Sequence, residues 1–435
     1  MAYRHPAFDK TLKNLHNTME YNAAGQPVIR VTSSTASSTE SASTDGFGRQ
    51  RVSTPYTLFD SQMRYSERND LWASDFTGVT TSGAYINAES AMNLSVGTDS
   101  GARYTRETKR VFAYQPGKSF QVFTTFVMSA GETGLSQRVG LFNDDNGIFF
   151  ANIDGVNCIV KRSSSSGALV ETVVPQSEWN VDNLDGNNVT GIDIDITKAQ
   201  IFFIDFEWLG VGEVRCGFVV DGAFYFAHVF SHANNVETTY MTTACLPLRY
   251  EIENTGATTG AHTLKQICAT VISEGGYALR GRKHGVSMPI LAASLKSMTN
   301  AQSWPLLSVR LKADRLDAIA VLASAGAFVD TAGNYTFSLV KGGTLANASF
   351  TSAATNSHVE YDTNADGISG GDVLVTKSFL YTNQSQADID FGGDIFDYQF
   401  ERDGLSNTPS IYTIVVTGTP NNFKGSGFIN WEEVF

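Results

Sequence analysis

Apolar side chains occupy every second position in many short stretches of the chain, above all within residues 104–277. In a β-strand, successive side chains point to opposite faces, so this alternation predicts strands with one buried face. The clearest sets of residues predicted to share one face are Phe120, Val122 and Phe126, and then Phe202, Ile204, Phe206 and Trp208.

Turn-forming residues separate these runs at short intervals. Asp221-Gly222 joins two alternating runs and predicts a two-residue hairpin, because such turns need positive φ at both positions. Asp154-Gly155 and residues 143–147 predict further turns of the same layout. About a dozen strands without a helical period predict a two-sheet sandwich, and we expect a concanavalin-like jelly roll.

A second series of short strands, rich in Val, Ile, Thr and Tyr, fills residues 288–435. Between the two series, residues 275–287 are glycine-rich and basic, which favours a domain boundary. This stretch contains a basic cluster, Arg280, Arg282 and Lys283. The cluster would either contact a carboxylate-bearing neighbour or belong to a solvated linker. The predicted fold class is all-β: a jelly-roll sandwich over residues 66–280, then a second β-sandwich over residues 288–435.

An extended N-terminal docking arm is predicted over residues 1–65. It includes a short helix at residues 8–19 and a Ser/Thr-rich linker at residues 32–44 (TSSTASSTESAST). Residues 44–65 are too polar for a core strand and too aromatic for a free linker, and they predict a segment ordered by docking. An ordinary first strand with a turn is the alternative. The predicted docking residues are Phe47, Tyr56 and Phe59, which would seat the segment, and Arg49, Arg51 and Arg64, which would meet an acidic neighbour.

Charge and cysteine content narrow the range of partners. The chain of 435 residues has a formal net charge of −13, which argues against a general nucleic-acid binder. No apolar run approaches the ~20 residues of a membrane-spanning helix, so no membrane insertion is expected. The four cysteines are far apart and lack CxxC spacing, which predicts small buried hydrophobes rather than a zinc or redox site.

The stretch FIDFEWLG resembles the EIDIEFLG-type motif of glycoside hydrolases built on concanavalin-like sandwiches, the laminarinase and lichenase group. In that motif the first Glu is the nucleophile, the Asp supports it, and the second Glu is the general acid/base. Asp205 and Glu207 match the last two positions, but Phe203 stands at the position of the nucleophile. A retaining mechanism needs both carboxyl groups. We therefore predict no hydrolase, and the resemblance leaves open a glycan-binding relic.

Candidate metal ligands are sparse. Asp362, Asn364 and Asp366 begin like a calcium loop, but Val373 stands where the closing Glu is needed, so a plain surface turn is favoured. His228 and His232 are four residues apart in an extended context, which does not suit a zinc pair. No Gly-rich phosphate loop follows a predicted strand and opens a helix, and neither a cofactor nor a nucleophilic site is expected.

Three passages together resemble virion structural proteins of tailed bacteriophages, notably those of aquatic and cyanobacterial hosts: DGFGRQRVSTPYTLFDSQMRY, followed by WLGVGEVRCGFVVDG and LPLRYEIENTG. The C-terminal part, including HVEYDTNADGISGGDVLV and INWEEVF, also resembles domains of such proteins. The resemblance implies a location in the virion, an N-terminal attachment part and outward β-sandwich modules.

The predicted function is therefore a non-enzymatic structural component of a tailed-phage virion, docked through its arm. The expected partners are other virion proteins and further copies of the chain. A tail fibre or baseplate-proximal appendage is favoured over a capsid decoration or cement protein. A module that binds a host surface glycan is the alternative from another class, with exposed tryptophans as sugar-stacking candidates.

Overall fold

The structure of the chain is a computed structural model. It describes residues 20–21, 27–28, 44–45, 49–51, 54–188, 190–278, 280–300, 302–381, 386–390 and 396–434. The helix predicted at residues 8–19 and residues 32–43 of the predicted linker lie outside the described residues. Among the described residues, the only helical element is the 3-10 turn η2 (Gln176–Glu178), and the fold class is all-β, as predicted.

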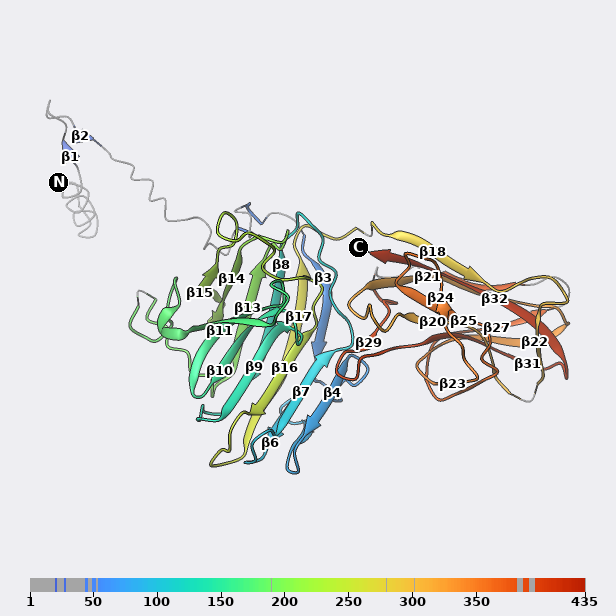
Figure 1. Ribbon diagram of the computed structural model, residues 1–435, viewed down its shortest axis with the longest axis horizontal. Helices are drawn as coiled ribbons and strands as arrows, with labels where there is room; N and C mark the ends of the chain where they lie inside the picture. The colour runs from blue at the N-terminus through green and yellow to red at the C-terminus, as the bar shows by residue number, and fades with distance from the viewer. Residues whose placement is uncertain are drawn as a thin grey trace, which may run out of the picture.

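The first domain is a sandwich of two antiparallel sheets (Figure 1, blue to yellow). One sheet has seven strands among the described residues, in the order β12 (Val170–Pro175), β11 (Val156–Ser163), β10 (Gly147–Ile153), β9 (Leu135–Phe142), β16 (Leu248–Asn254), β7 (Arg103–Thr108) and β4 (Trp72–Thr77). The described strands of the other sheet are β15 (Ala223–Phe230), β14 (Val214–Val220), β13 (Gln200–Phe206), β8 (Phe120–Val127), β17 (His262–Ser273), β6 (Ala91–Val96) and β5 (Ser82–Ile86), with β3 (Tyr56–Gln62) paired to β17. This is the predicted jelly-roll architecture.

Local turn chemistry sets the register of the hairpins. Asp221 and Gly222 have φ values of 50° and 77°, and Val220 pairs with Ala223 across the turn. Asp154-Gly155 forms the same turn between β10 and β11. Both hairpin predictions are confirmed, because Asp-Gly tolerates the two left-handed conformations that a primed turn requires.

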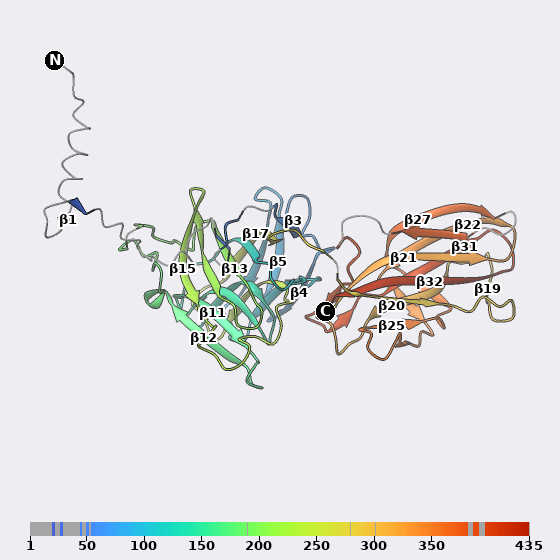
Figure 2. The same cartoon turned by 90° about the horizontal axis from the view of Figure 1, so that it is seen from above.

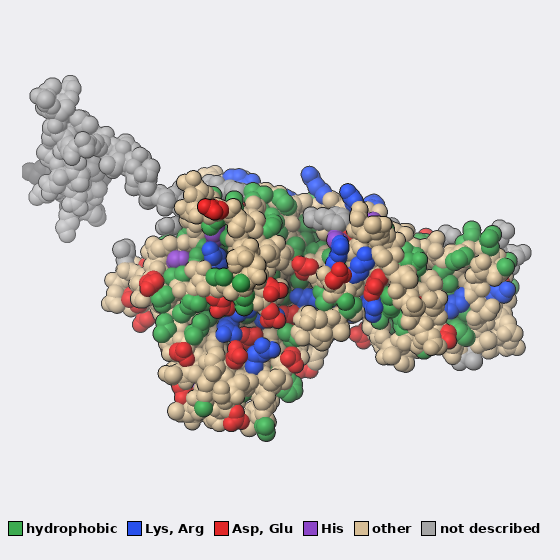
Figure 3. All heavy atoms as spheres, in the orientation of Figure 1, with side chains coloured by type: hydrophobic (Ala, Val, Ile, Leu, Met, Phe, Trp, Pro, Cys, Tyr) green, Lys and Arg blue, Asp and Glu red, His purple; other side chains and the backbone are tan. Residues whose placement is uncertain are grey.

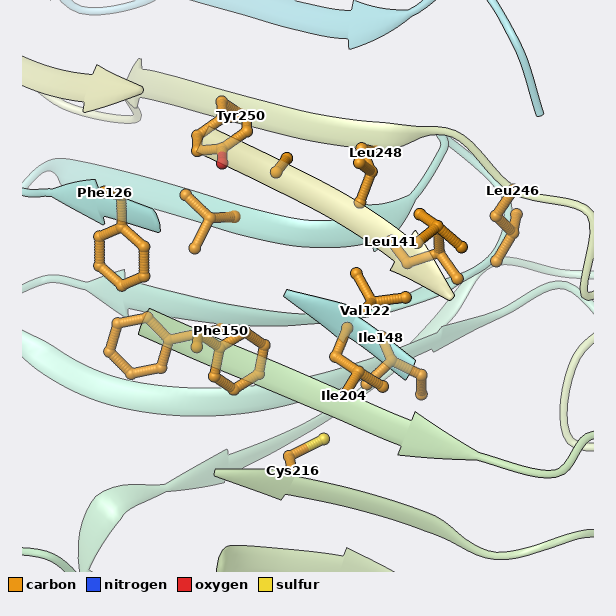
Figure 4. Close-up of a cluster of buried hydrophobic side chains, with 14 of the residues drawn as sticks. Val122, Phe126, Leu141, Ile148, Phe150, Ile204, Cys216, Leu246, Leu248 and Tyr250 are labelled. Atoms are coloured by element: carbon orange, nitrogen blue, oxygen red, sulfur yellow. The ribbon is translucent and has the colours of Figure 1, made fainter. Parts of the chain in front are cut away.

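The core of the jelly roll lies between its two sheets. Side chains from both sheets point toward one another there, as Figure 4 shows. Phe202, Ile204 and Phe206 are at most 1% exposed, so the predicted buried face of β13 is confirmed. The four cysteines are unpaired, two of them fully buried and two partly buried, in agreement with their predicted role as small hydrophobes.

The second domain is a smaller sandwich with its own core (Figure 2, orange and red). One sheet contains β18 (Arg282–Ser287), β32 (Phe423–Val434), β21 (Ile319–Val329) and β28 (Gln386–Asp390), with β19 (Lys296–Met298) paired to β32. The other contains β24 (Thr351–Ser352), β25 (Val359–Asp362), β20 (Trp304–Leu311), β31 (Tyr412–Gly418), β22 (Gly333–Lys341) and β27 (Asp372–Tyr381).

Three short pairs complete the described strands: β1 (Glu20–Tyr21) with β2 (Pro27–Val28), β23 (Thr344–Ala346) with β26 (Gly367–Ser369), and β29 (Arg402–Asp403) with β30 (Thr408–Pro409).

Two predicted boundaries need correction. Residues 56–62, assigned to the arm, form strand β3, which pairs with β17 in the jelly roll. Arg282–Ser287, assigned to the linker, forms strand β18 and pairs with β32. In both cases the segment is polar or basic, and apolar and polar residues alternate only weakly along it. It becomes a strand because the edge of an existing sheet supplies hydrogen-bond partners for its backbone.

The two domains meet through buried charges and through a shared core. Glu107 on β7 is 0% exposed and accepts hydrogen bonds from Arg249 at 2.6 and 2.9 Å and from Arg402 of the second domain. Arg110 donates to Glu401 at 3.0 Å, and Phe396 packs on Tyr277 with ring centroids 4.8 Å apart. Desolvated ion pairs of this kind depend on complementary placement, so they hold the domains in one orientation.

Candidate functional site: an arginine strap on an acidic pair

Residues 44–45 and 49–51 lie at one end of the jelly roll, and we call these described residues the strap. Its described residues form a closed turn: the backbone N–H of Asp45 donates to the carbonyl of Arg49 at 2.8 Å, and that of Arg49 donates to Oδ1 of Asp45 at 2.8 Å. The Arg49 side chain also donates to Oδ2 of Asp45 at 2.6 Å. The turn therefore carries Arg49 and Arg51 as a preformed pair of cations.

Asp205 is the centre of the site, and its side chain is 1% exposed. It stands on the outer face of β13, since Phe202, Ile204 and Phe206 take the inner face, and it lies directly across from Arg215 on β14. Arg215 and Arg51 both donate to Oδ2, and the Ser119 hydroxyl donates to Oδ1 at 2.8 Å. The carboxylate is thus fully engaged by donors from three separate segments.

Arg51 also ties the strap to the end of the sheet. Its Nη1 donates to Oε1 of Glu274 at 3.1 Å, and its Nε donates to the carbonyl oxygen of Thr44 at 2.9 Å. Arg215 donates to the same Thr44 carbonyl at 2.9 Å. Side-chain exposures of 12% for Arg51 and 0% for Arg215 place these contacts away from solvent, where charge-assisted hydrogen bonds are strong.

Glu207 is the second acid of the pair, and its side chain is 0% exposed. The Tyr114 hydroxyl donates to Oε2 at 3.2 Å, and Arg49 approaches Oε1 at 3.4 Å. Burial raises the pKa of Glu207 to about 8 against the opposing effect of these two donors, so the carboxyl group is mostly protonated at neutral pH. Burial likewise raises the pKa of Tyr114 to about 12.

Phe203 fills the position that a glycosidase nucleophile would take. Its ring is 1% exposed and contacts the rings of Phe224 and Phe226 at centroid distances of 5.0 and 5.1 Å. A Cβ added at Gly217 on the neighbouring strand would lie 2.9 Å from this ring. The position is therefore part of a packed aromatic cluster, and the strap, rather than a substrate, meets the two acids.

The predicted docking residues are not one cluster. Arg49 and Arg51 meet acidic groups, but those groups belong to the same chain. Tyr56 and Phe59 lie on β3, where Phe59 is 6% exposed and packs on Trp72 and Phe112 within the core. Arg64 is exposed and lies over the ring of Tyr65 at 4.9 Å. Phe47 lies outside the described residues.

The candidate calcium loop has a structural use for its carboxylates. Asp362 is 1% exposed, and its oxygens accept the backbone N–H groups of Ser349, Asn364 and Ala365. Both oxygens of Asp366 accept from the Asn347 side chain. Among the described residues no group of three or more His, Cys, Asp or Glu side chains could hold a metal ion. Asn364 and Asp366 are exposed, as expected for a surface turn, whereas Asp362 is buried at the end of β25.

His228 and His232 belong to a buried cluster at the end of β15. The Nδ1–H of His232 donates to the carbonyl of Gly212 at 2.7 Å, which leaves Nε2 to accept from Lys161 at 3.1 Å, and the ring stacks on Tyr240. Burial, with Lys161 nearby, lowers the pKa of both histidines to about 4. Neither ring nitrogen of His232 is therefore available as a metal ligand.

Because the pKa values of these two histidines are lowered, we expect the protein to lose stability in acid. The unfolded chain binds protons on both histidines near pH 6.5, whereas the folded chain does so only near pH 4, so stability falls as the pH decreases through this window. We expect the melting temperature to drop by roughly 5–10 °C between pH 6.5 and 4.5, measured by circular dichroism. The double variant His228→Asn/His232→Gln should have a flatter profile, and an unchanged slope would contradict this origin.

No family model matches the chain, and no curated protein matches it. Some solved structures are weakly similar to the chain. A protein of unknown function from Shewanella oneidensis MR-1 has a TM-score of 0.33 and 9% identity, with 64% of this chain and 98% of that chain covered. A Bacteroides ovatus GH16 protein in complex with a glucan product has a TM-score of 0.32 and 10% identity, with 49% and 99% covered. Peanut lectin has a TM-score of 0.27 and 10% identity, with 51% and 98% covered.

At these identities and TM-scores, no fold, substrate or partner of this chain follows from the likeness. The fold class rests on the strands and sheets that the described residues form. In the described part of the chain, none of the helical segments has the length and apolar character needed to cross a membrane.

Proposed function

We propose that the chain is a non-enzymatic structural component of a tailed-phage virion, a tail appendage that docks through the residues preceding its strap. The observation that supports this proposal is the attachment of the strap to Asp205, Glu207 and Glu274 by Arg49 and Arg51. This network fixes the first described residues of the jelly-roll domain to the end of its sheet. A docking arm needs such an anchor to transmit load from its partner to the module.

The chemistry of the acidic pair supports the non-enzymatic part of the proposal. Both oxygens of Asp205 are engaged, Glu207 is buried beneath Tyr114 and Arg49, and the third position is Phe203. A retaining glycosidase needs a free carboxylate nucleophile opposite an acid. The five tryptophans are all buried or partly buried, so none of them offers an open stacking surface for a glycan.

Removing residues 1–43 should leave the module folded and abolish its incorporation into particles. The variant keeps the whole strap, and its melting temperature should remain within about 2 °C of that of the full chain because no described contact of the two domains is lost. Incorporation is measured by immunoblotting purified particles after complementation. The matched control scrambles the order of residues 32–43 at constant composition and should still incorporate.

Incorporation of the truncated chain at the level of the full chain would contradict the docking proposal. Electron microscopy of particles labelled on the second domain then separates the two virion locations. Label at the tail is expected, and label distributed over the capsid would favour a decoration or cement protein.

A further inference from the structure

A pocket of about 350 Å³ lies where the jelly roll, the interdomain linker and the last strand meet. It belongs neither to the strap nor to the acidic pair. The described residues that line it are Tyr114, Gln115, Pro116 and Lys118 before β8, Tyr277, Ala278 and Arg280 after β17, and Val434 at the end of β32. Junctions between domains are common places for ligand pockets, because two rigid bodies form the walls.

Two cations face this pocket, and its described lining contains no Asp or Glu. Lys118 is held in place by donating to the carbonyl oxygens of Gly275 at 2.9 Å and Gly276 at 2.8 Å. Burial, and then the nearby charge of Arg280, lowers the pKa of Lys118. In a chain of net charge −13, two neighbouring cations without a lining carboxylate attract an anion. Figure 3 shows basic side chains gathered near the start of β18, close to this junction.

Gln115 adds a hydrogen-bond acceptor to the pocket. Its Nε2 donates to the carbonyl of Ala278 at 2.9 Å, which fixes the orientation of the amide. Its Oε1 is buried and has no partner among the described residues. A buried acceptor of this kind is stabilised when a ligand supplies an O–H or N–H donor. The rest of the lining, Pro116, Tyr277 and Val434, is largely apolar.

A neighbouring pocket has a different character. It has a volume of about 290 Å³ and shares Lys118, but its lining includes Asp45 and Glu274, which are already paired with Arg49 and Arg51. Three cations and two acids line it, and four of these five groups are already paired with one another, so only Lys118 is left as an excess cation. The pocket at the domain junction has two cations and no acid among its lining residues and is therefore the stronger candidate for an anion.

We propose that the pocket at the domain junction binds a hexuronic acid unit of an acidic polysaccharide. The sugar carboxylate pairs with Arg280 and Lys118, a ring hydroxyl donates to Oε1 of Gln115, and the C–H face of the ring packs on the apolar lining. A compact pocket bounded by three chain segments suits one sugar ring better than an extended peptide, which needs an open groove. This inference does not depend on the docking function of the arm.

The test uses the intact chain and galacturonate as the probe, in low salt, with isothermal titration calorimetry and saturation-transfer NMR. Galacturonate should bind at least tenfold more tightly than galactose or acetate, because only the acidic sugar supplies both the carboxylate and the ring. Arg280→Gln should weaken galacturonate binding at least fivefold. Gln115→Leu should also weaken galacturonate binding but should leave the affinity for acetate unchanged. Lys283→Gln removes the same charge from an exposed position outside the lining and should leave the affinity unchanged.

Three outcomes would overturn the proposal. Equal binding of galactose would show that the cations play no part. Equal binding of acetate would reduce the site to non-specific anion attraction. Binding of a hexaglutamate peptide in place of galacturonate, with the same loss in Arg280→Gln, would assign the pocket to an acidic protein segment. Unchanged thermal unfolding of Arg280→Gln, checked in parallel, keeps a loss of binding separate from a loss of fold.

Discussion

Asp205→Asn should lower the free energy of unfolding of the jelly roll by about 3–5 kcal/mol, the range measured when one partner of a buried ion pair is removed. Asparagine keeps the size of the side chain but leaves Arg215 and Arg51 without the carboxylate that both contact. The effect is measured by urea unfolding at pH 7, followed by tryptophan fluorescence. The strap should also detach, which protease cleavage within residues 44–55 would report.

The matched control is Glu207→Gln, two residues away on the same strand end. Because burial raises the pKa of Glu207 to about 8, its carboxyl group is mostly protonated at pH 7, and an amide replaces it with a cost of at most about 1 kcal/mol. The raised pKa contributes stability that is complete below about pH 4.5 and is lost as the pH rises from there to about 8, so the amide should also remove this decrease. Similar costs for Asp205→Asn and Glu207→Gln would contradict the assignment of Asp205 as the centre of the network.

Glu107→Gln should weaken the junction between the two domains by about 3–5 kcal/mol for the same physical reason. Glu107 is 0% exposed and holds Arg249 of the jelly roll and Arg402 of the second domain. Its removal leaves the buried Arg402 without its carboxylate and leaves Arg249 mainly with the exposed Asp144. The variant should unfold in two separate calorimetric transitions, one for each domain, where the unchanged protein unfolds in one. The linker at residues 275–281 should also become sensitive to trypsin.

Glu253→Gln provides the comparison on the same sheet. Glu253 contacts Arg138 at 3.1 Å, but its side chain is 29% exposed, and Arg138 keeps Glu251 as a second partner. Surface pairs of this kind contribute about 0–1 kcal/mol, so both the unfolding transition and the linker cleavage should be unchanged. If the junction stays intact in Glu107→Gln, the apolar contacts between the domains are enough to hold them together. The contact of Phe396 with Tyr277 is one of these.

The parts of the fold that could be predicted are those set by neighbouring residues. The Asp221-Gly222 hairpin follows from two consecutive positive φ values, and the buried face of β13 follows from alternation over seven residues. Tyr56–Gln62 could not be assigned to the sheet, because its pairing with β17 joins residues more than 200 positions apart. The polar residues Asp60 and Gln62 also weaken the apolar pattern of this segment. Both side chains are exposed, where the sheet tolerates them.

The site shows the same division. The sequence identifies Asp205 and Glu207 as a conspicuous acidic pair and Phe203 as a misfit for catalysis, and it marks Arg49 and Arg51 as cations that need an acidic neighbour. It contains no local signal that these four residues belong together. Arg215, Ser119 and Glu274 were not anticipated as partners at all, since each lies on a different segment and its role depends on strand order and register.

By itself, then, the sequence determined the all-β class, the hairpins, the buried faces and the phenylalanine at the position of a glycosidase nucleophile, because each depends on residue type and short-range spacing. Only the tertiary structure decided that the arginines of the strap contact the acids of the same chain, that Glu107 joins the two domains, and that Lys118 and Arg280 face one pocket. Charges interact through distance in space, and in a sandwich of long-range strand pairs that distance is set by the assembled sheets.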